Sequence, residues 1–410
     1  MYDKPALLGN TPAFSQFVPL VRPTLPPYDD GLARRVAELF ETGMLTKGKY
    51  LREFETRMAE FLGVKHTVAV SSCTLGLLLT CHGLGLKGEV IVPSFTFMAT
   101  VHPLIWVGAE PVFVDIDPHT WNIDPTRVEP AITEHTTAII AVHNFGNPAP
   151  IAELEAIAHR HSLRLIFDAA HGFGSLYRGK PVGGFGDAEV FSLSPTKLLV
   201  AAEGGIVATD NDELARHIRV GREYGNPGDY GSEFPGLNAR LPEFNAILGL
   251  RSLEMLEENS VRRNRVAAAF RDRLGRIPGL VFQRIHPEDR SSYKDLSMLV
   301  DEAGFGLTRD ELALALWAEN VDTRKYHDPP VHAHRAYRHL YHRCRNALPV
   351  TDHVAPRSLS LPIWSHMDKE TVEGICRAIE RIHHHAERVH RALAAQGVQP
   401  LPTVTGAEGD

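Results

Sequence analysis

The chain has 410 residues, of which 43% are apolar, and its formal net charge at pH 7 is −7. This length can bury at least one large core and favours two or three lobes. The acidic balance and the lack of a long basic run argue against nucleic-acid binding and against an electrostatic membrane surface. No apolar stretch approaches the roughly 18 residues of a membrane span, and the start, MYDKPALLGN, lacks the order of a signal peptide. We therefore expect a soluble, cytoplasmic protein.

The cysteines and histidines give no pattern of a metal site. The four cysteines lack CxxC spacing, so we expect reduced, partly buried thiols and no disulfide. They are Cys73, Cys81, Cys344 and Cys376. Residues 324–345 are rich in histidine, and a metal site there is conceivable, but no HExxH motif or Cys/His frame is present. We predict no bound metal.

The first 260 residues predict an N-terminal arm followed by a large α/β domain. Residues 1–30 are rich in proline and weakly periodic, which is typical of an arm over a surface or a partner subunit. Segments 30–43 and 52–63 have helical spacing, and the first stops at Gly43. Short apolar strands then alternate with helices, which indicates a mostly parallel seven-stranded sheet covered on both faces. The strands are HTVAVSS, GEVIVPSF, EPVFVDID, TAIIAVHNFG, LRLIFDAA, AEVFSLS and GGIVATD.

The remaining residues predict a smaller α/β domain. A helical region runs over about 242–277, and the strands GLVFQRI and KDLSMLVDE, the helix TRDELALALWAENV and a final helix over 369–393 follow it. We expect an arm at 1–30, a large domain at 31–260, a small domain at 261–395 and a flexible tail at 396–410.

A carboxylate follows one strand of the predicted sheet. Asp168 ends the apolar run of LRLIFDAAH, and His171 comes three residues later. Ligands of parallel sheets gather beyond the carboxyl ends of the strands, so Asp168 is a candidate site residue. Its alternative role is a helix N-cap.

A second feature is the segment VAVSSCTLGLLLT, which passes from a strand directly into a helix. Ser71, Ser72, Cys73 and Thr74 bring small hydroxyls and free backbone N–H groups to a helix N-terminus. Such an arrangement holds a phosphate well, although Ser and Thr also cap most helices.

The third feature is Lys197, which follows the strand AEVFSLS in the segment FSLSPTKLL. A lysine at this depth forms a salt bridge or snorkels, or else has a pKa lowered by partial burial, so that its neutral amine attacks a carbonyl. With Ser192, the carboxylate and the phosphate cradle, it completes the set of groups that pyridoxal 5′-phosphate (PLP) needs. The lysine would form a Schiff base with the aldehyde, and Asp168 would keep the ring nitrogen protonated. The sequence therefore predicts a PLP site.

The chain resembles the DegT-type sugar aminotransferases, which are PLP enzymes of fold type I. The resemblance runs from about residue 43 to 249 and continues more faintly to about 381. It is carried by TKGKYLREFE, SSCTLGLLL, VPSFTFMATVHPLIWVGAEPVFVDIDPHTWNIDP, AVHNFGNP, FDAAHGFGSLYRGKPVGGFGDAEVFSLSPTKLLVAAEGGIVATD and GLNARLPEFNAILGL. A series of this length in the same order is very specific.

The resemblance implies a role for each matching residue. Lys197 would be the Schiff-base lysine and proton shuttle, and Asp168 the partner of the pyridinium nitrogen. Phe97 would stack on the ring, and His171 would lie near its oxygen. Contacts to the cofactor phosphate would come from Cys73, Thr74, Ser192 and, from the other subunit of a homodimer, Asn238.

Three positions depart from the family pattern. Cys73 stands where relatives often have Gly, Phe167 where Glu commonly precedes the Asp, and Leu198 where Asn often follows the Lys. None removes a catalytic group. The family's sugar 3-dehydratases carry His at the position of Lys197, so the lysine favours transamination.

The resemblance also implies a substrate class. An amino donor, in relatives glutamate, would convert the cofactor to pyridoxamine 5′-phosphate, and a nucleotide-linked 4-keto or 3-keto deoxysugar would accept the amine in amino-sugar biosynthesis. The candidate substrate-binding residues are Arg240, Lys325, Tyr326 and His327. Arg222 and Arg324 also fall in segments around the site mouth, and surface charge is the alternative for each cation. The alternative functions are a keto-cyclitol aminotransferase, a PLP-dependent dehydratase and a non-catalytic PLP-binding regulator.

Overall fold

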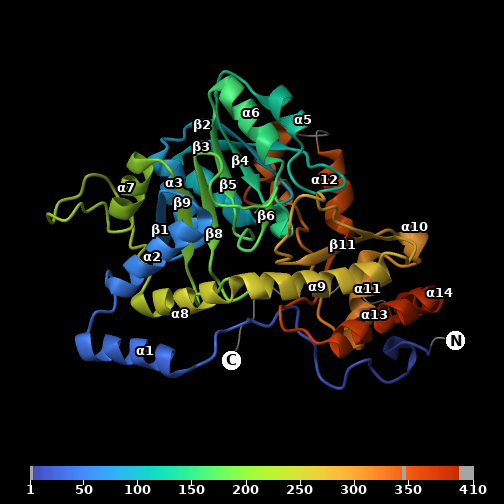
Figure 1. Cartoon of the computed structure of the whole chain (residues 1–410). Helices are drawn as coiled ribbons and strands as arrows, with labels where there is room; N and C mark the ends of the chain where they lie inside the picture. The colour runs from blue at the N-terminus through green and yellow to red at the C-terminus, as the bar shows by residue number, and fades with distance from the viewer. Residues whose placement is uncertain (1–2, 344–347, 397–410) are drawn as a thin grey trace.

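A computed structural model describes residues 3–343 and 348–396 of the chain (Figure 1). Its main feature is a seven-stranded sheet in the order β1-β9-β8-β5-β4-β2-β3, in which β9 is antiparallel to both of its neighbours and the other pairs are parallel. The strands are β1 (His66–Val70), β2 (Gly88–Pro93), β3 (Ala109–Val114), β4 (Thr136–Val142), β5 (Arg164–Asp168), β8 (Ala188–Ser192) and β9 (Gly205–Thr209). The predicted α/β fold class and its seven strands are confirmed.

Helices cover both faces of this sheet, and each face has its own apolar cluster. Leu165 and Phe167 of β5 pack with α2, α6 and α8 on one face, whereas Ile166 packs with α3, α4 and α7 on the other. Successive side chains of a strand point to opposite faces, so a strand buried on both faces must be apolar throughout. The helices on the two faces are α2 (Lys49–Leu62), α6 (Ile151–His161) and α8 (Glu243–Glu254), and α3 (Cys73–Gly83), α4 (His102–Val107) and α7 (Asp212–Gly221).

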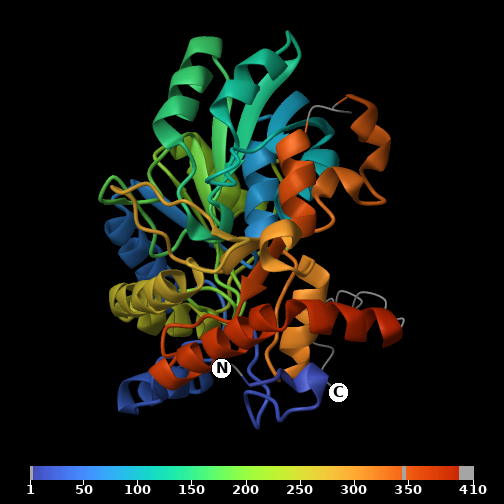
Figure 2. The same cartoon turned by 90° about the vertical axis from the view of Figure 1, so that its right-hand side faces the viewer.

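A second, antiparallel sheet of three strands, β10-β11-β12, forms the core of the C-terminal part. Figure 1 shows the long helix α9 running from the larger sheet toward this part, and Figure 2 shows the red C-terminal helices of this part below that sheet. The helical region predicted over 242–277 is two consecutive helices, α8 and α9, because the chain leaves the helix at Met255. The final predicted helix is likewise divided into α13 and α14 at His385. The bounds are α9 (Leu256–Leu274), β10 (Leu280–Phe282), β11 (Leu296–Val300), β12 (Ser358–Leu361), α13 (Lys369–His384) and α14 (Ala386–Gln396).

The remaining elements are short or lie at the periphery. They are α1 (Asp30–Thr42), α5 (Pro125–Val128), α10 (Glu302–Phe305), α11 (Arg309–Ala318), α12 (Pro349–Val354) and the two-residue strands β6 (Leu176–Tyr177) and β7 (Lys180–Pro181). Of the predicted tail, 396–410, only residue 396 lies within the described residues.

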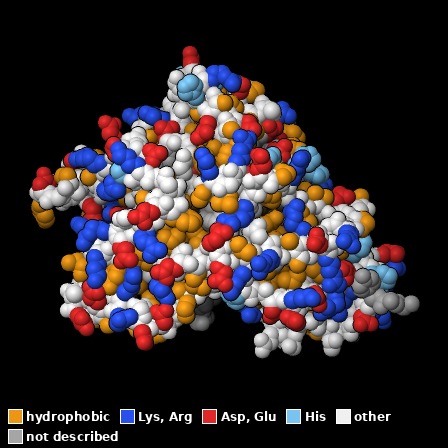
Figure 3. Space-filling model, in the orientation of Figure 1, with side chains coloured by type: hydrophobic (Ala, Val, Ile, Leu, Met, Phe, Trp, Pro, Cys, Tyr) orange, Lys and Arg blue, Asp and Glu red, His pale blue; other side chains and the backbone are white. Residues whose placement is uncertain are grey.

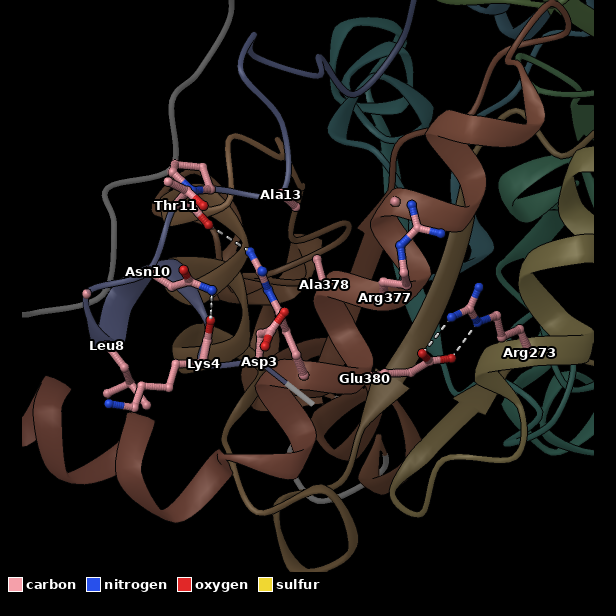
Figure 4. Close-up of a pocket in the computed structure, with 14 residues that line it drawn as sticks. Asp3, Lys4, Leu8, Asn10, Thr11, Ala13, Arg273, Arg377, Ala378 and Glu380 are labelled. Atoms are coloured by element: carbon pink, nitrogen blue, oxygen red, sulfur yellow. Dashed lines mark hydrogen bonds and ion pairs between the residues drawn. The ribbon is translucent and has the colours of Figure 1, made fainter. Parts of the chain in front are cut away.

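The N-terminal arm lies on the C-terminal part of its own chain (Figure 4). The buried carboxylate of Glu319 accepts hydrogen bonds from the backbone N–H groups of Ala6 (2.9 Å) and Ala13 (2.8 Å) and pairs with Arg381. Arg381 also donates to the carbonyl of Thr11. A shallow hollow of about 820 Å³ lies between the arm and α13. One buried ion pair therefore holds both ends of the first loop of the arm.

The surface carries charges of both signs. Lys and Arg side chains alternate with Asp and Glu over the face in Figure 3. Within the described part, no helix combines the length and apolar character of a membrane span. Cys73, Cys81 and Cys376 are free and buried, and Cys344 lies outside the described residues.

Candidate active site

A cavity of about 360 Å³ lies at the carboxyl edge of the large sheet. Its wall comes from the ends of β1, β4, β5 and β8 and from two segments of the C-terminal part, 294–295 and 326–327. Of the predicted site residues, the structure brings the following to this wall: Cys73, Thr74, Phe97, Asp168, His171, Ser192, Lys197, Tyr326 and His327.

Asp168 is the last residue of β5, and its carboxylate is almost completely buried. Its Oδ2 accepts a hydrogen bond from the Thr100 hydroxyl (2.6 Å), and its Oδ1 accepts one from the backbone N–H of Ala170 (3.0 Å). Burial raises the pKa of Asp168, while these two bonds and the positive charge of Lys197 act in the opposite direction. The carboxylate retains lone pairs for a cationic N–H in the cavity, and such a partner would stabilise its charged form.

The start of α3 faces the same cavity. Ser72 is the N-cap, and its Oγ accepts from the backbone N–H of Leu75 (3.2 Å). The first backbone bond within the helix runs from Gly76 to Ser72, so the N–H groups of Cys73 and Thr74 precede it. A Cβ atom at Gly205 would lie 2.7 Å from the backbone N of Cys73, which shows how closely β9 approaches the helix start. This end of α3 is suited to an anion.

Lys197 lies in the turn after β8, where its backbone N–H donates a hydrogen bond to the carbonyl of Ser194. Among the described residues its ammonium forms no hydrogen bond or close ion pair. Burial, followed by the positive charge of Lys294, lowers the pKa of Lys197 from 10.5 to about 8, against the charges of Asp295, Cys73 and Asp168. A lysine of this kind has a usable fraction of neutral amine near neutral pH.

Three further predicted residues complete this wall. Phe97 lines the cavity and is 52% exposed, so its apolar side chain is available to a flat ligand. The Nδ1 atom of His171 is buried without a hydrogen-bond partner, and burial holds the pKa of this imidazole well below its usual range. Ser192 ends β8 with its hydroxyl next to the turn that carries Lys197.

A buried pair behind Asp168 was not predicted. The backbone N–H of Ala149 donates to Nδ1 of His143 (2.9 Å), so Nε2 carries the proton and donates to Glu189 Oε2 (3.0 Å). Both side chains are fully buried, and the Phe167 ring stacks on the imidazole at 5.1 Å. The family commonly has Glu at the position before Asp168, where this chain has Phe167. In this chain a buried carboxylate is supplied instead by Glu189 of β8.

The cavity also contains residues that sequence reasoning missed. Asn144 follows β4, and its Oδ1 lies 3.3 Å from Nε2 of His327. The His327 ring also stacks on Phe145. Burial lowers the pKa of His327 to about 3, so this imidazole is neutral. Lys294 and Asp295 face each other in the wall. In the sequence, KDLSMLV shows only that two charges directly precede an apolar strand, and this does not indicate that both side chains line a cavity.

The predicted cations at the site mouth do not line the cavity, and each is paired with an acid. The pairs are Arg222–Glu55, Arg240–Glu223, Arg324–Asp322 and Lys325–Asp310. Asn238 is exposed and lies outside its own cavity, on the segment that follows the projecting loop after α7 (Figure 1). No group of three or more potential metal ligands occurs in the part of the chain that the structure describes.

The fold and this site define the class of fold-type I PLP-dependent aminotransferases. The chain belongs to the DegT/DnrJ/EryC1/StrS aminotransferase family, whose model matches residues 28–380. It is accordingly an enzyme, a PLP-dependent sugar aminotransferase.

Individual relatives cover most of the chain. The spore coat polysaccharide biosynthesis protein SpsC of Bacillus subtilis (strain 168) is 36% identical over 85% of this chain and 93% of its own. The dTDP-4-amino-4,6-dideoxy-D-glucose transaminase of Escherichia coli is 30% identical over 88% and 98%. Among solved structures, that of DesI in the presence of its TDP-sugar product has a TM-score of 0.85 and 39% identity, and covers 96% of this chain and 98% of DesI.

Proposed function

We propose that this enzyme transfers an amino group from an amino acid, L-glutamate, to the C4 or C3 keto carbon of a nucleotide-linked deoxysugar in amino-sugar biosynthesis. The observation that carries the proposal is the single cavity shared by Lys197, Asp168 and the start of α3. The dTDP-sugar transaminase and the DesI complex with a TDP-sugar product, both similar to this chain, support the substrate class.

The residues of the cavity fit PLP. The unpartnered Nδ1 of His171 needs a polar group from a ligand, because an unpaired buried nitrogen is costly. The free N–H groups at the start of α3 would hold the phosphate, and the exposed Phe97 ring would cover the pyridine ring. When bound, the cofactor supplies an aldehyde carbon that an amine can attack and a ring that withdraws electrons.

Two side chains would perform the proton chemistry. Lys197 would release a proton from Nζ to become a nucleophile and would then carry protons to and from the substrate carbon. Its pKa of about 8 suits both tasks near neutral pH. Asp168 would accept a hydrogen bond from a protonated ring nitrogen and so keep that nitrogen cationic.

The proposed contacts to the sugar ring come from the C-terminal part of the chain. Tyr326 and His327 line the cavity, so we propose that they contact the sugar. Arg240 and Lys325 would have to exchange their present partners, Glu223 and Asp310, for phosphate oxygens. Their assignment as substrate-binding residues stays a prediction.

We also propose a cytoplasmic homodimer with shared sites. The exposed Asn238 would reach the phosphate of the partner's cofactor, and the free thiols of Cys73, Cys81 and Cys376 suit a reducing compartment. Mixed dimers of Lys197→Ala and Asn238→Ala subunits, each inactive alone, should regain about one working site per heterodimer. No recovery would argue against a shared site.

The test of the function uses the purified protein loaded with PLP. L-glutamate alone should change its absorbance to that of the pyridoxamine form and release 2-oxoglutarate, and a panel of nucleotide keto sugars and keto-cyclitols should reverse the change. The Lys197→Ala variant is the control. No conversion by any amino donor would refute transamination, and reversal by cyclitols alone would favour the alternative acceptor.

A further inference from the structure

Transamination with glutamate needs a cation for the donor's carboxylates. Among the described residues that line the cavity, the Lys and Arg side chains are Lys197 and Lys294. Lys197 has to react as a neutral amine, and His171 and His327 are kept neutral by burial. Lys294 is therefore the remaining candidate within this chain.

Lys294 is part of an ion pair built into the wall. Its Nζ lies 2.8 Å from Oδ1 and 3.0 Å from Oδ2 of Asp295, and the two side chains are 8% and 4% exposed. β11 begins directly after the pair, and Tyr293, directly before it, has a left-handed φ of 46°. The chain turns there, and both charged side chains line the cavity.

The ammonium of Lys294 also lies near an aromatic ring and has unused donors. Its ammonium lies 5.2 Å from the centre of the Tyr326 ring, a cation–π distance. An ammonium has three N–H donors, so Lys294 can bind an additional oxygen without leaving Asp295.

Asp295 also acts on a second cation. The guanidinium of Arg263 on α9 is buried, with Nε and Nη1 unpartnered. Burial lowers the pKa of Arg263 to about 10, and the negative charge of Asp295 acts against this lowering. The charge of Asp295 therefore acts on Arg263 as well as on Lys294.

We propose, on the basis of the function proposed above, that Lys294 binds a carboxylate of the amino donor, and that Asp295 holds the ammonium when a keto sugar occupies the site. A two-substrate cavity has to accept an anionic amino acid and a neutral sugar ring in turn. An ion pair inside the wall meets both demands, since it offers a cation to the donor and remains neutralised for the sugar. The cavity of about 360 Å³ is too small for a whole nucleotide sugar, so the diphosphate lies outside the reach of this buried pair.

The first test separates the two half-reactions of the PLP-loaded enzyme. Lys294→Met should raise the glutamate concentration for half-maximal conversion by about 10- to 100-fold. The loss of its charge also acts on the pKa of Lys197, but this effect is common to both half-reactions. The concentration of the corresponding amino sugar for half-maximal conversion should therefore change less than about threefold. Lys294→Arg, which keeps the charge, should restore glutamate use in part. Lys65→Met removes a surface ammonium that pairs with Asp212 and is the matched control.

The second test measures binding without turnover. Glutarate carries both carboxylates of glutamate but no amine, and its affinity can be measured by calorimetry on the loaded enzyme. Lys294→Met should weaken glutarate binding by about the same factor. Asp295→Asn should strengthen it several-fold, because the lysine is then no longer neutralised.

The outcomes distinguish this inference from the proposed function. If glutamate converts the wild-type enzyme but Lys294→Met uses glutamate and binds glutarate as tightly as the wild type, Lys294 is not the donor site. If Lys294→Met does not fold, the Asp295→Asn variant provides the test. Glutarate binding by this variant that is unchanged or weaker would also mean that Lys294 is not the donor site. Failure of every amino donor with the wild type refutes the transaminase function instead.

Discussion

Replacement of Lys197 by Met should stabilise the protein without its cofactor. Burial and Lys294 lower the pKa of Lys197 from 10.5 to about 8, so at neutral pH the folded protein holds an ammonium that water would stabilise better. The cost is about 3 kcal/mol at pH 7, where both the folded and the unfolded chain carry mostly the charged form. An activated lysine is thus obtained at the expense of stability.

The sign of the pH dependence follows from the lowered pKa. The cost is complete below about pH 8, declines as the pH rises, and is absent above the ordinary pKa of 10.5. At about pH 9.5 roughly 1 kcal/mol remains. The stability advantage of Lys197→Met over the wild type should therefore shrink by about 2 kcal/mol between pH 7 and pH 9.5.

Urea unfolding of the two apoproteins at both pH values measures this difference. Packing changes caused by the methionine do not titrate, so they cancel when the two pH values are compared. Lys65→Met serves as a control, since this side chain is exposed. An advantage that is equal at both pH values would refute the lowered pKa of Lys197.

Three further predictions concern single side chains. Asp168→Asn should raise the dissociation constant of PLP by about 10- to 100-fold by removing a charge-assisted hydrogen bond, and equal retention on dialysis would contradict the role of this carboxylate. Glu189→Ala should lower the free energy of unfolding by about 3 to 5 kcal/mol, because it leaves buried donors on His143, Gly183 and Phe185 unpaired. A loss below about 1 kcal/mol would show that the His143–Glu189 pair does not stabilise the fold. Glu319→Ala should expose the arm to proteases within residues 3–13, as read by mass spectrometry of the cleaved ends, and an unchanged cleavage pattern would show that other contacts hold the arm.

The large sheet could be predicted from the sequence because its strands are buried on both faces and read as continuous apolar runs. Asp168 and Lys197 could be assigned to one site for a related reason, since the carboxyl ends of parallel strands share one edge. β12 was missed because SLSL is short and has polar residues at alternate positions. The breaks within the two long helical regions have no Pro or Gly at the junction and left no signal.

The polar pairs of the interior could not be predicted, since each depends on a register or a turn. His143 and Glu189 lie on different strands, and apolar patterns do not specify which polar residues meet. Lys294 and Asp295 precede β11, and their place in the sequence does not indicate that both side chains line the cavity. The acids that engage Arg240 and Lys325 also come from other segments of the chain.

The central claim is that the amine of Lys197 forms the covalent bond to the cofactor. Wild-type protein supplied with PLP and reduced with borohydride should carry one cofactor adduct, on the peptide that contains Lys197, and Lys197→Ala should carry none. An adduct on another lysine of the wild type, or an equal adduct in the variant, would contradict this account.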